Sequence, residues 1–225
     1  MCVVWPERVN DAELPDMLRL EAALWSEGVQ VVAGLDEVGR GCIAGPVVAS
    51  AVVLGPVSAK ILYGAGVRDS KTLSAARREA LERMVRECAL SVAVGVVWPE
   101  EIDRLNILQA SLKAMAVAVA GLVLRPDMLL VDGNQNVPCD IPQNAVVRGD
   151  ACSVSIAAAS IVAKVYRDEL MCRIAADYPE YLFHKNKGYP TPEHIAALKR
   201  HGVSSVHRKS FGPVRRCMPQ FASLF

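Results

Sequence analysis

The stretch VQVVAGLDEVGRG, residues 29–41, joins an apolar run to two adjacent carboxylates and a glycine-containing turn. Residues 29–35 have the pattern of a buried strand. Asp36 and Glu37 follow at its end, where two carboxylates are costly unless a cation neutralises them. Carboxylate oxygens suit Mg²⁺ or Mn²⁺, and the glycines at 39 and 41 let backbone N–H groups approach an anion. The stretch therefore indicates metal-assisted chemistry on a phosphate.

The elements around this stretch alternate between strand and helix patterns. After the first strand and a turn at 39–45, the pattern predicts a second, hairpin-like strand, a loop, a helix capped by Ser74, a third strand and a long helix. Two short buried strands, an Ala-rich helix, one further helix and a basic tail follow. The expected ranges are 46–54, 55–73, 74–88, 90–97, 99–123, 128–131, 145–147, 151–176 and 193–201. This order predicts an α/β fold with a mixed central sheet flanked by helices.

Composition and charge set the class of protein. The chain has 225 residues, 52% of them apolar, which excludes global disorder. The net charge of +1 hides an asymmetry, because residues 1–27 carry six acids and two bases whereas residues 184–217 carry eight bases and one acid. A basic region of this kind suits nucleic acid, although a solvated basic surface is an equal alternative. We expect an N-terminal extension at 1–28, a catalytic domain at 29–183 and a basic helical region at 184–225.

The cysteines and termini indicate a cytoplasmic protein. Seven cysteines are scattered without a CxxC pair, so neither a disulfide framework nor a zinc site is expected. The four histidines show no zinc-binding spacing either. The N-terminus lacks the pattern of a signal peptide, and the longest apolar stretch, residues 114–124, is too short to span a bilayer.

Further carboxylates stand at the ends of other predicted strands. Asp132 follows the strand at 128–131, and Asp150 lies just beyond the strand at 145–147. Open α/β sheets bind ligands at strand ends, so these side chains are expected to join Asp36 and Glu37 around one cavity holding two Mg²⁺ or Mn²⁺ ions. Adjacent strand residues point to opposite faces, so the strand must end or bend near Glu37. Each aspartate alone also fits a turn or helix cap.

The segment at 39–44 also matches the dinucleotide-binding pattern GxGxxA. That pattern requires a helix starting within it and an acid about 20 residues further on. Here Pro46 and a Val-rich strand follow, and the region around residues 59 and 60 has no acid. We therefore reject a nucleotide-binding fold of the Rossmann type.

Several weaker motifs carry groups suited to a phosphate or a base. Ser70 and Lys71 lie in a predicted loop, and Arg208 and Lys209 belong to a basic stretch. These four residues are candidates for phosphate contacts, with plain surface charge as the alternative. Tyr189, after Lys187 and Gly188, is a candidate for stacking on a sugar or base, with core packing as the alternative.

Taken in order, these motifs closely resemble bacterial ribonuclease HII, a type 2 ribonuclease H. The similarity spans residues 29–214. It rests on LDEVGRG at 35–41, AGP at 44–46, DSK at 69–71, LNI at 105–107, VDGN at 131–134, GD at 149–150, SIAAASI at 155–161, KGY at 187–189 and HRKSF at 207–211.

The resemblance implies an RNase H-like fold with a small C-terminal helical appendage. It also implies an endonuclease that acts on RNA–DNA hybrids and on single ribonucleotides in duplex DNA, and so removes ribonucleotides from DNA. Two Mg²⁺ or Mn²⁺ ions would act, leaving 3′-hydroxyl and 5′-phosphate ends. Carried over by position, the metal-binding and catalytic residues would be Asp36, Glu37, Asp132 and Asp150. Gly39, Arg40 and Gly41 would contact the 2′-hydroxyl through their backbone, and Tyr189 would stack on the next sugar.

Three departures from the family pattern bear on activity, at Cys152, Tyr166 and Pro190, where the family commonly has a basic residue, a Thr and a Gly. Residues 220–225 faintly resemble peptides that bind sliding clamps, although a tail packed on the domain or frayed is the favoured alternative. We expect a monomer. Two rival functions stay open: a nucleic-acid-binding protein without catalysis, and a different nuclease or integrase on the same fold.

Overall fold

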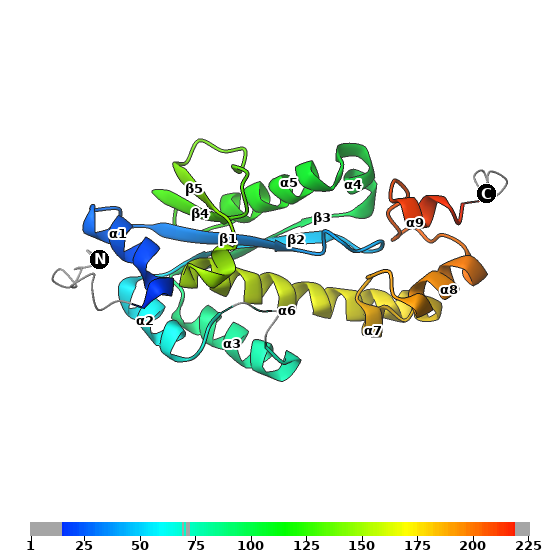
Figure 1. The fold of residues 1–225 in the computed structure, drawn as a ribbon, viewed down its shortest axis with the longest axis horizontal. Coiled ribbons are helices and arrows are strands. Elements are labelled where there is room, and N and C mark those ends of the chain that lie inside the picture. Colours follow the sequence, from blue (N-terminus) through cyan, green and yellow to red (C-terminus); the bar gives the residue numbers. More distant parts are fainter. Residues whose placement is uncertain (1–14, 69, 71–72, 219–225) are drawn as a thin grey trace.

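A five-stranded mixed sheet forms the centre of the protein (Figure 1), which we describe from a computed structural model over residues 15–68, 70 and 73–218. The strand order is β3-β2-β1-β4-β5. Strands β3, β2 and β1 are antiparallel neighbours, whereas β4 and β5 run parallel to β1. The strands are β1 Val32–Val38, β2 Val47–Val53, β3 Ser91–Val97, β4 Met128–Asp132 and β5 Gln143–Val146. The predicted mixed sheet is confirmed.

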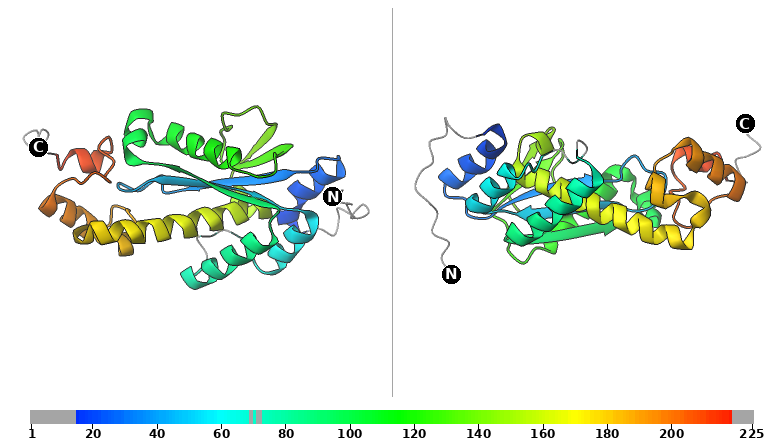
Figure 2. Two further views of the ribbon diagram at one scale, coloured as in Figure 1. Left: turned by 180° about the vertical axis from the view of Figure 1, so that it is seen from behind. Right: turned by 90° about the horizontal axis from the view of Figure 1, so that it is seen from below.

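Helices cover both faces of this sheet. In Figures 1 and 2, α4 and α5 lie on one face and the long α6 crosses the other, with α2 and α3 beyond it. The helices are α1 Arg19–Ser26, α2 Pro56–Gly64, α3 Ala75–Cys88, α4 Pro99–Leu105, α5 Ile107–Ala120, α6 Val154–Asp177, α7 Phe183–Asn186, α8 Pro192–His201 and α9 Gly212–Arg215. Short 3₁₀ turns occupy Asp16–Leu18, Gly149–Ala151 and Pro179–Tyr181.

The side chains of β1 alternate between two cores. Ala33 and Leu35 pack in the cluster that includes α5, whereas Val32 packs with Ile156 of α6. This alternation is the period of two that a strand imposes. Gly34 lies where β1 meets α6, and a Cβ there would collide with the Ser155 backbone. The sheet and α6 therefore approach closely next to the residues that precede Asp36.

The second half of α6 extends beyond the sheet and supports the C-terminal helices (Figure 2). Met171 and Ile174 of α6 pack with Phe183, Leu198 and Val214 in a separate apolar cluster. This cluster brings α7, α8 and α9 to the end of the sheet where the turn between β1 and β2 lies. Residues far apart in the sequence thus surround that turn.

Several predicted elements differ from those observed, and β1 begins at Val32 instead of residue 29. Strand β1 continues through Val38, because Asp36, Glu37 and Val38 all pair with β2. Part of the predicted loop at 55–73 is helix α2, which begins at Pro56 and buries Ala59 and Leu62. The predicted helix at 99–123 is two helices.

The break between α4 and α5 lies at Asn106, which has a φ of 76°. Its side-chain oxygen accepts hydrogen bonds from the backbone N–H groups of Leu108 and Gln109, at 3.0 and 3.1 Å. Asparagine tolerates this left-handed conformation and caps helices well, so a new helix starts here.

The N-terminal helix packs on the domain, as predicted for that extension. Leu24 of α1 is buried with Val32 and Ile156. Every cysteine that the structure describes is free. No helix among the described residues is long and apolar enough to cross a membrane.

Candidate active site

Asp36 and Asp132 lie on neighbouring parallel strands at the same level. Strand β1 pairs with β4 so that Leu35 is opposite Val131, and each aspartate is the next residue along its strand. Leu35 and Val131 both belong to the cluster that includes α5. Because strand side chains alternate, both aspartates are directed to the α6 face. The register of the sheet therefore brings together two carboxylates that are 96 residues apart in sequence.

The surroundings of Asp36 disfavour the negatively charged form of its side chain. Its side chain is buried, and burial followed by the charge of Glu37 raises its pKa well above the ordinary value, with Asp132 contributing in the same direction. A hydrogen bond with Ser160 and the 2.7 Å bond from the Glu37 backbone N–H act in the opposite direction. A buried carboxylate of this kind is stabilised by a bound cation.

Glu37 has a cationic partner in the structure. Its Oε1 lies 3.0 Å from Nη1 of Arg40, and its side chain is only 10% exposed. Burial raises the pKa of Glu37, and the pairing with Arg40 lowers it. Glu37 continues strand β1, so the predicted end or bend of the strand does not occur there. The charge of Asp132 nevertheless raises the pKa of Glu37, so the two carboxylates are close enough to interact. Arg40 thus neutralises one of the four candidate metal ligands.

Asp150 is held next to Asp132 by the backbone that precedes it. The Gly149 N–H donates a 2.7 Å hydrogen bond to Oδ1 of Asp132. Asp150 follows in the 3₁₀ turn at the start of α6 and is 6% exposed. This bond connects the ends of β4 and β5 to the helix that carries Ser160.

These carboxylates fit a divalent ion, although they are not a complete cage. Within the part of the chain that the structure describes, no group of three His, Cys, Asp or Glu side chains is arranged to hold a metal by itself. Magnesium commonly keeps several waters and takes only one or two protein carboxylates together with substrate phosphates. The oxygen donors and the raised pKa of Asp36 match that mode of binding.

The turn between β1 and β2 is fixed from beneath by Arg167 of α6. Its guanidinium donates to the carbonyl oxygens of Pro46, Lys187 and Ala44, at 2.9, 2.9 and 3.2 Å. Arg167 is fully buried. Gly39 has a φ of 95°, and a Cβ there would collide with the Arg167 side chain, so only glycine fits.

Arg208 also supports this turn, which corrects its predicted role. Its Nε donates to the Gly45 carbonyl at 3.0 Å and its Nη1 to the Arg40 carbonyl at 3.1 Å. The guanidinium lies 5.2 Å from the centre of the Phe211 ring, and the residue is fully buried. A side chain buried in this way contacts the protein backbone rather than a phosphate.

Tyr189 lies beside the glycine turn, although 148 residues separate it from Gly41. A Cβ on Gly41 would lie 3.9 Å from Cε1 of Tyr189. Tyr189 is 40% exposed, so part of its ring is open to a ligand. The backbone turn and the aromatic ring, both predicted to contact substrate, therefore share one surface.

The other predicted phosphate contacts have different outcomes. Ser70 is 4% exposed, and its hydroxyl lies 2.9 Å from that of Ser160, so it supports the Asp36 environment instead of facing a phosphate. Lys71 lies outside the described residues. Lys209 is exposed, and its backbone N–H donates to Asp103 at 2.8 Å. Its side chain is therefore available to a phosphate.

Sequence reasoning missed three residues that hold the site: Arg167, Asp103 and Glu21. Asp103 of α4 accepts hydrogen bonds from the backbone of Lys209 and Ser210. Glu21 of α1 is fully buried, and its Oε1 accepts from the Ser153 hydroxyl at 2.5 Å and the Ser155 N–H at 2.9 Å. No local pattern marks these contacts, because each joins segments distant in sequence.

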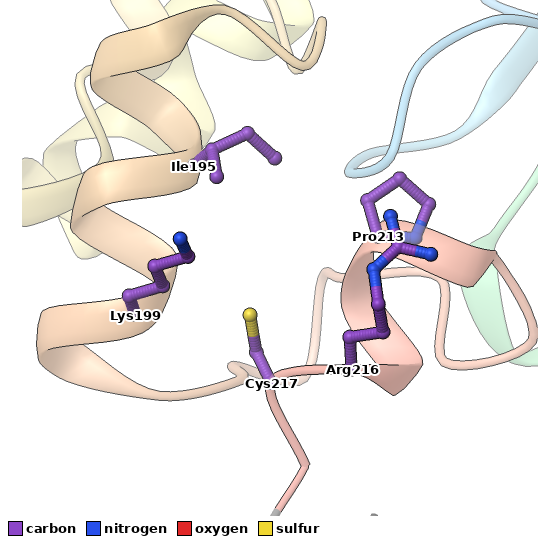
Figure 3. Close-up of a pocket in the computed structure, with 5 residues that line it drawn as sticks. All are labelled: Ile195, Lys199, Pro213, Arg216 and Cys217. Carbon is purple, nitrogen blue, oxygen red and sulfur yellow. The ribbon is translucent and has the colours of Figure 1, made fainter. Parts of the chain in front are cut away.

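A separate pocket of about 450 Å³ lies between α8 and the α9 region. Figure 3 shows Ile195 projecting from α8 toward Pro213, with Lys199 and Arg216 on opposite sides and Cys217 between them. Two cationic side chains thus border a hollow in the predicted basic region. It shares no lining residue with the carboxylate site.

Comparison with known proteins identifies relatives of this arrangement. The family model described as ribonuclease HII matches residues 33–214. A ribonuclease HII of Syntrophobacter fumaroxidans is 52% identical over 200 residues, which cover 89% of this chain and 84% of that protein.

Two solved structures share the fold. The ribonuclease H2 from Pyrococcus horikoshii has a TM-score of 0.74 and 27% identity, covering 86% of this chain and 99% of its own. A PCNA:RNase HII complex from Archaeoglobus fulgidus has a TM-score of 0.68 and 28% identity, covering 79% of this chain and 93% of its own.

Proposed function

The chain belongs to the ribonuclease HII family and is a ribonuclease H enzyme, and on this basis we propose the bond that it cleaves and the residues that act. The proposed reaction is hydrolysis of the phosphodiester on the 5′ side of a ribonucleotide, in RNA–DNA hybrids and at single ribonucleotides in duplex DNA. The products would carry 3′-hydroxyl and 5′-phosphate ends. In the cell this reaction would serve the removal of ribonucleotides from DNA.

One observation carries the proposal: the carboxylates, the glycine turn and Tyr189 are contiguous. Asp36 and Glu37 lead directly into the turn, and Gly41 lies beside the Tyr189 ring. A bound strand would therefore meet a reactive centre and a sugar-recognising surface at successive nucleotides. A binding protein would gain nothing from anionic side chains that face phosphates, which argues against a function without catalysis.

Divalent metal dependence is a property of this family, and we propose that Asp36 and Asp132 hold the metal, with Glu37 and Asp150 completing the site with substrate. The bound ions would neutralise the phosphate and polarise the attacking water. Asp36 and Asp132 present oxygen donors on one face of the sheet. Gly149 fixes the direction of Asp132 through its hydrogen bond.

We propose that the substrate is recognised by its sugars and not by its bases. The 2′-hydroxyl is what distinguishes a ribonucleotide within DNA. The backbone of Gly39, Arg40 and Gly41 offers a rigid surface for this group, because Arg167 and Arg208 fix the turn from beneath. Tyr189 would stack on the following sugar and test that it is deoxyribose.

A labelled DNA duplex with one ribonucleotide tests the proposal, with an all-DNA duplex of the same sequence as control. Each is incubated with Mg²⁺, with Mn²⁺ and with chelator. We expect metal-dependent cleavage on the 5′ side of the ribonucleotide and an intact control. Cleavage of the all-DNA duplex would instead support a different nuclease on this fold.

We also propose a weak contact of residues 220–225 with a sliding clamp. The solved complex from Archaeoglobus fulgidus, whose title names PCNA and RNase HII, supports such a contact. Residues 220–225 lie outside the described part of the chain. Binding of the bacterial clamp by the full chain and by a chain truncated after residue 219 tests this, and equal affinity of the two would refute it.

A further inference from the structure

Two buried histidines form a hydrogen-bonded pair beneath Tyr189. His194 of α8 and His207 are both fully buried, and their Nε2 atoms lie 3.1 Å apart. The rings of Tyr181 and Phe183 surround them, with Tyr181 centred 4.7 Å from His207 and Phe183 centred 5.3 Å from His194. Burying two imidazoles in an aromatic cluster is unfavourable unless their nitrogens are satisfied.

The partners of this pair determine which nitrogens carry the protons. Nδ1 of His207 accepts a hydrogen bond from the Ser204 N–H at 3.1 Å, so that nitrogen is unprotonated. A neutral His207 then has its proton on Nε2 and donates it to Nε2 of His194. His194 must therefore carry its own proton on Nδ1. That N–H points to the Tyr189 carbonyl oxygen at 2.8 Å.

Both rings are neutral in this arrangement. Burial, followed by the proximity of His194, lowers the pKa of His207 to about 3. Burial also lowers the pKa of His194. Four groups thus form a directed chain from the Ser204 N–H, through His207 and His194, to the Tyr189 carbonyl. The Ser204 hydroxyl also lies 2.7 Å from Nδ1 of His207, where it is a second donor to that unprotonated nitrogen.

The hydrogen-bonded series also reaches the glycine turn, through the backbone around His207. His207 forms an isolated β-bridge with Ala44. The next residue, Arg208, donates its backbone N–H to the Ile43 carbonyl at 2.9 Å and its guanidinium to the Arg40 carbonyl. The pair therefore spans the two elements proposed to recognise the substrate, the turn at 39–41 and the loop that presents Tyr189.

We propose that His194 and His207 are positioning residues, which set the place of the Tyr189 ring relative to the turn and thereby the selectivity for an RNA-to-DNA junction. Neither contacts substrate. The inference rests on the proposed function of Tyr189. It differs from simple core packing, because an apolar residue of similar size would fill the space but leave the Tyr189 carbonyl without the imidazole donor.

The conformation of the loop explains why such a donor is needed. Lys187 and Gly188, directly before Tyr189, both have positive φ values, of 51° and 85°. Non-glycine residues in this region are strained and persist only where surrounding contacts hold them. The Tyr189 carbonyl is anchored by His194 and by the Thr191 N–H at 2.8 Å. Loss of the imidazole leaves one anchor on a strained loop.

The first test reads the tautomers in the unmodified enzyme. Long-range ¹H–¹⁵N NMR of the histidine rings distinguishes Nδ1–H from Nε2–H. We expect His194 as the Nδ1–H form and His207 as the Nε2–H form, both neutral from pH 6 to pH 8. A His194 protonated on Nε2, or a charged ring in this range, would overturn the proposed chain of donors.

The second test compares two variants of His194. His194→Asn retains an amide N–H near the position of Nδ1, whereas His194→Phe removes the donor and keeps a ring. The measured quantity is the ratio of kcat/KM on a duplex with one ribonucleotide to kcat/KM on a continuous RNA–DNA hybrid. We expect His194→Phe to lower this ratio roughly three- to tenfold, in line with the loss of one buried hydrogen bond, and His194→Asn to restore most of it.

Controls separate this inference from the proposed function. If Tyr189→Ala lowers the ratio and a folded His194→Phe leaves it unchanged, the positioning role is refuted and the proposed function stands. If Tyr189→Ala also leaves it unchanged, the proposed stacking role fails instead.

In a Tyr189→Ala background, His194→Phe should cause no further loss of selectivity. Should His194→Phe not fold, the tautomers of the unmodified enzyme decide the proposal independently.

Discussion

Asp36 and Asp132 stand on the same face of two neighbouring parallel strands, one residue beyond the pairing of Leu35 with Val131. This position follows from register alone, because a slip of one residue would direct one of the two to the opposite face. It explains how carboxylates from distant segments meet without a loop to bring them together. The charge of Asp132 also contributes to the raised pKa of Asp36, which shows that the two interact.

Asp132→Asn is expected to lower the single-turnover cleavage rate by at least about 100-fold, because an amide is a poor substitute for a metal-binding carboxylate. The amide oxygen can still accept the hydrogen bond from Gly149, so the fold and the affinity for duplex should be largely retained. Rapid-quench cleavage and fluorescence anisotropy with chelator measure the two effects. A near-normal rate in saturating Mg²⁺ would contradict the metal-binding role.

Tyr189→Ala is expected to weaken the preference for an RNA-to-DNA junction, because it removes the ring proposed to stack on the deoxyribose. An aromatic ring stacked on a base contributes about 1–3 kcal/mol, and for a sugar we expect the lower half of that range, so a loss of roughly five- to thirtyfold in relative kcat/KM is expected. Tyr189→Phe keeps the ring and serves as control. Equal preference in the wild type and in Tyr189→Ala would count against the stacking role.

The sequence predicts the elements that have strong local patterns and fails where distant contacts decide. The Val-rich strands and the helix capped by Ser74 lie where expected, since apolar periodicity and capping are local. The predicted helix at 99–123 breaks at Asn106, because a left-handed cap interrupts an otherwise continuous apolar pattern.

The same limit applies to the site. The apolar pattern predicts where the strands end, and these ends point to Asp132 and Asp150. The burial of Arg208 and Ser70 was not predictable, since a basic or polar motif looks the same whether it faces solvent or the backbone of another segment. Glu21 carries no local signal either, because its partners are 132 and 134 residues away.

Arg167→Leu is expected to destabilise the protein by about 3 kcal/mol or more, because it leaves three carbonyl oxygens near the turn without their donor. Arg173, exposed on the same helix, provides a matched control, and Arg173→Ala should change the free energy of unfolding by less than about 0.5 kcal/mol. Urea denaturation measures both. Similar effects of the two substitutions would show that Arg167 does not hold the turn.

His207 is expected to make the fold sensitive to acid. Its folded-state pKa of about 3 lies below the ordinary value of 6.5, so the unfolded chain binds a proton that the folded protein does not. The contribution of His207 to the free energy of unfolding is therefore complete above pH 6.5 and falls as the pH drops toward 3. At pH 4 about 3 kcal/mol of it is lost. The titratable groups that face it are His194 and Tyr181.

His207→Gln removes this titration and keeps a hydrogen-bond donor. The free energy of unfolding of the wild type minus that of the variant should therefore be smaller at pH 4 than at pH 7. Comparing the two proteins cancels the contributions of the carboxylates. A difference that is constant between these pH values would mean that the imidazole does not remain neutral in the fold.

Lys199 and Arg216 border the pocket between α8 and the α9 region and give the C-terminal end its local positive charge. If this surface carries duplex affinity, Lys199→Ala combined with Arg216→Ala should weaken binding of every duplex to a similar extent. The slope of log K against log salt should fall by about 1 for each phosphate contact that is lost. Arg19→Ala, at an exposed site on α1 at the opposite end of the molecule, removes one charge and is the net-charge control for each of the two single variants. Because these contacts carry no information on the sugar, selectivity for a ribonucleotide should not change. An unchanged salt slope in the double variant would place the duplex on another surface.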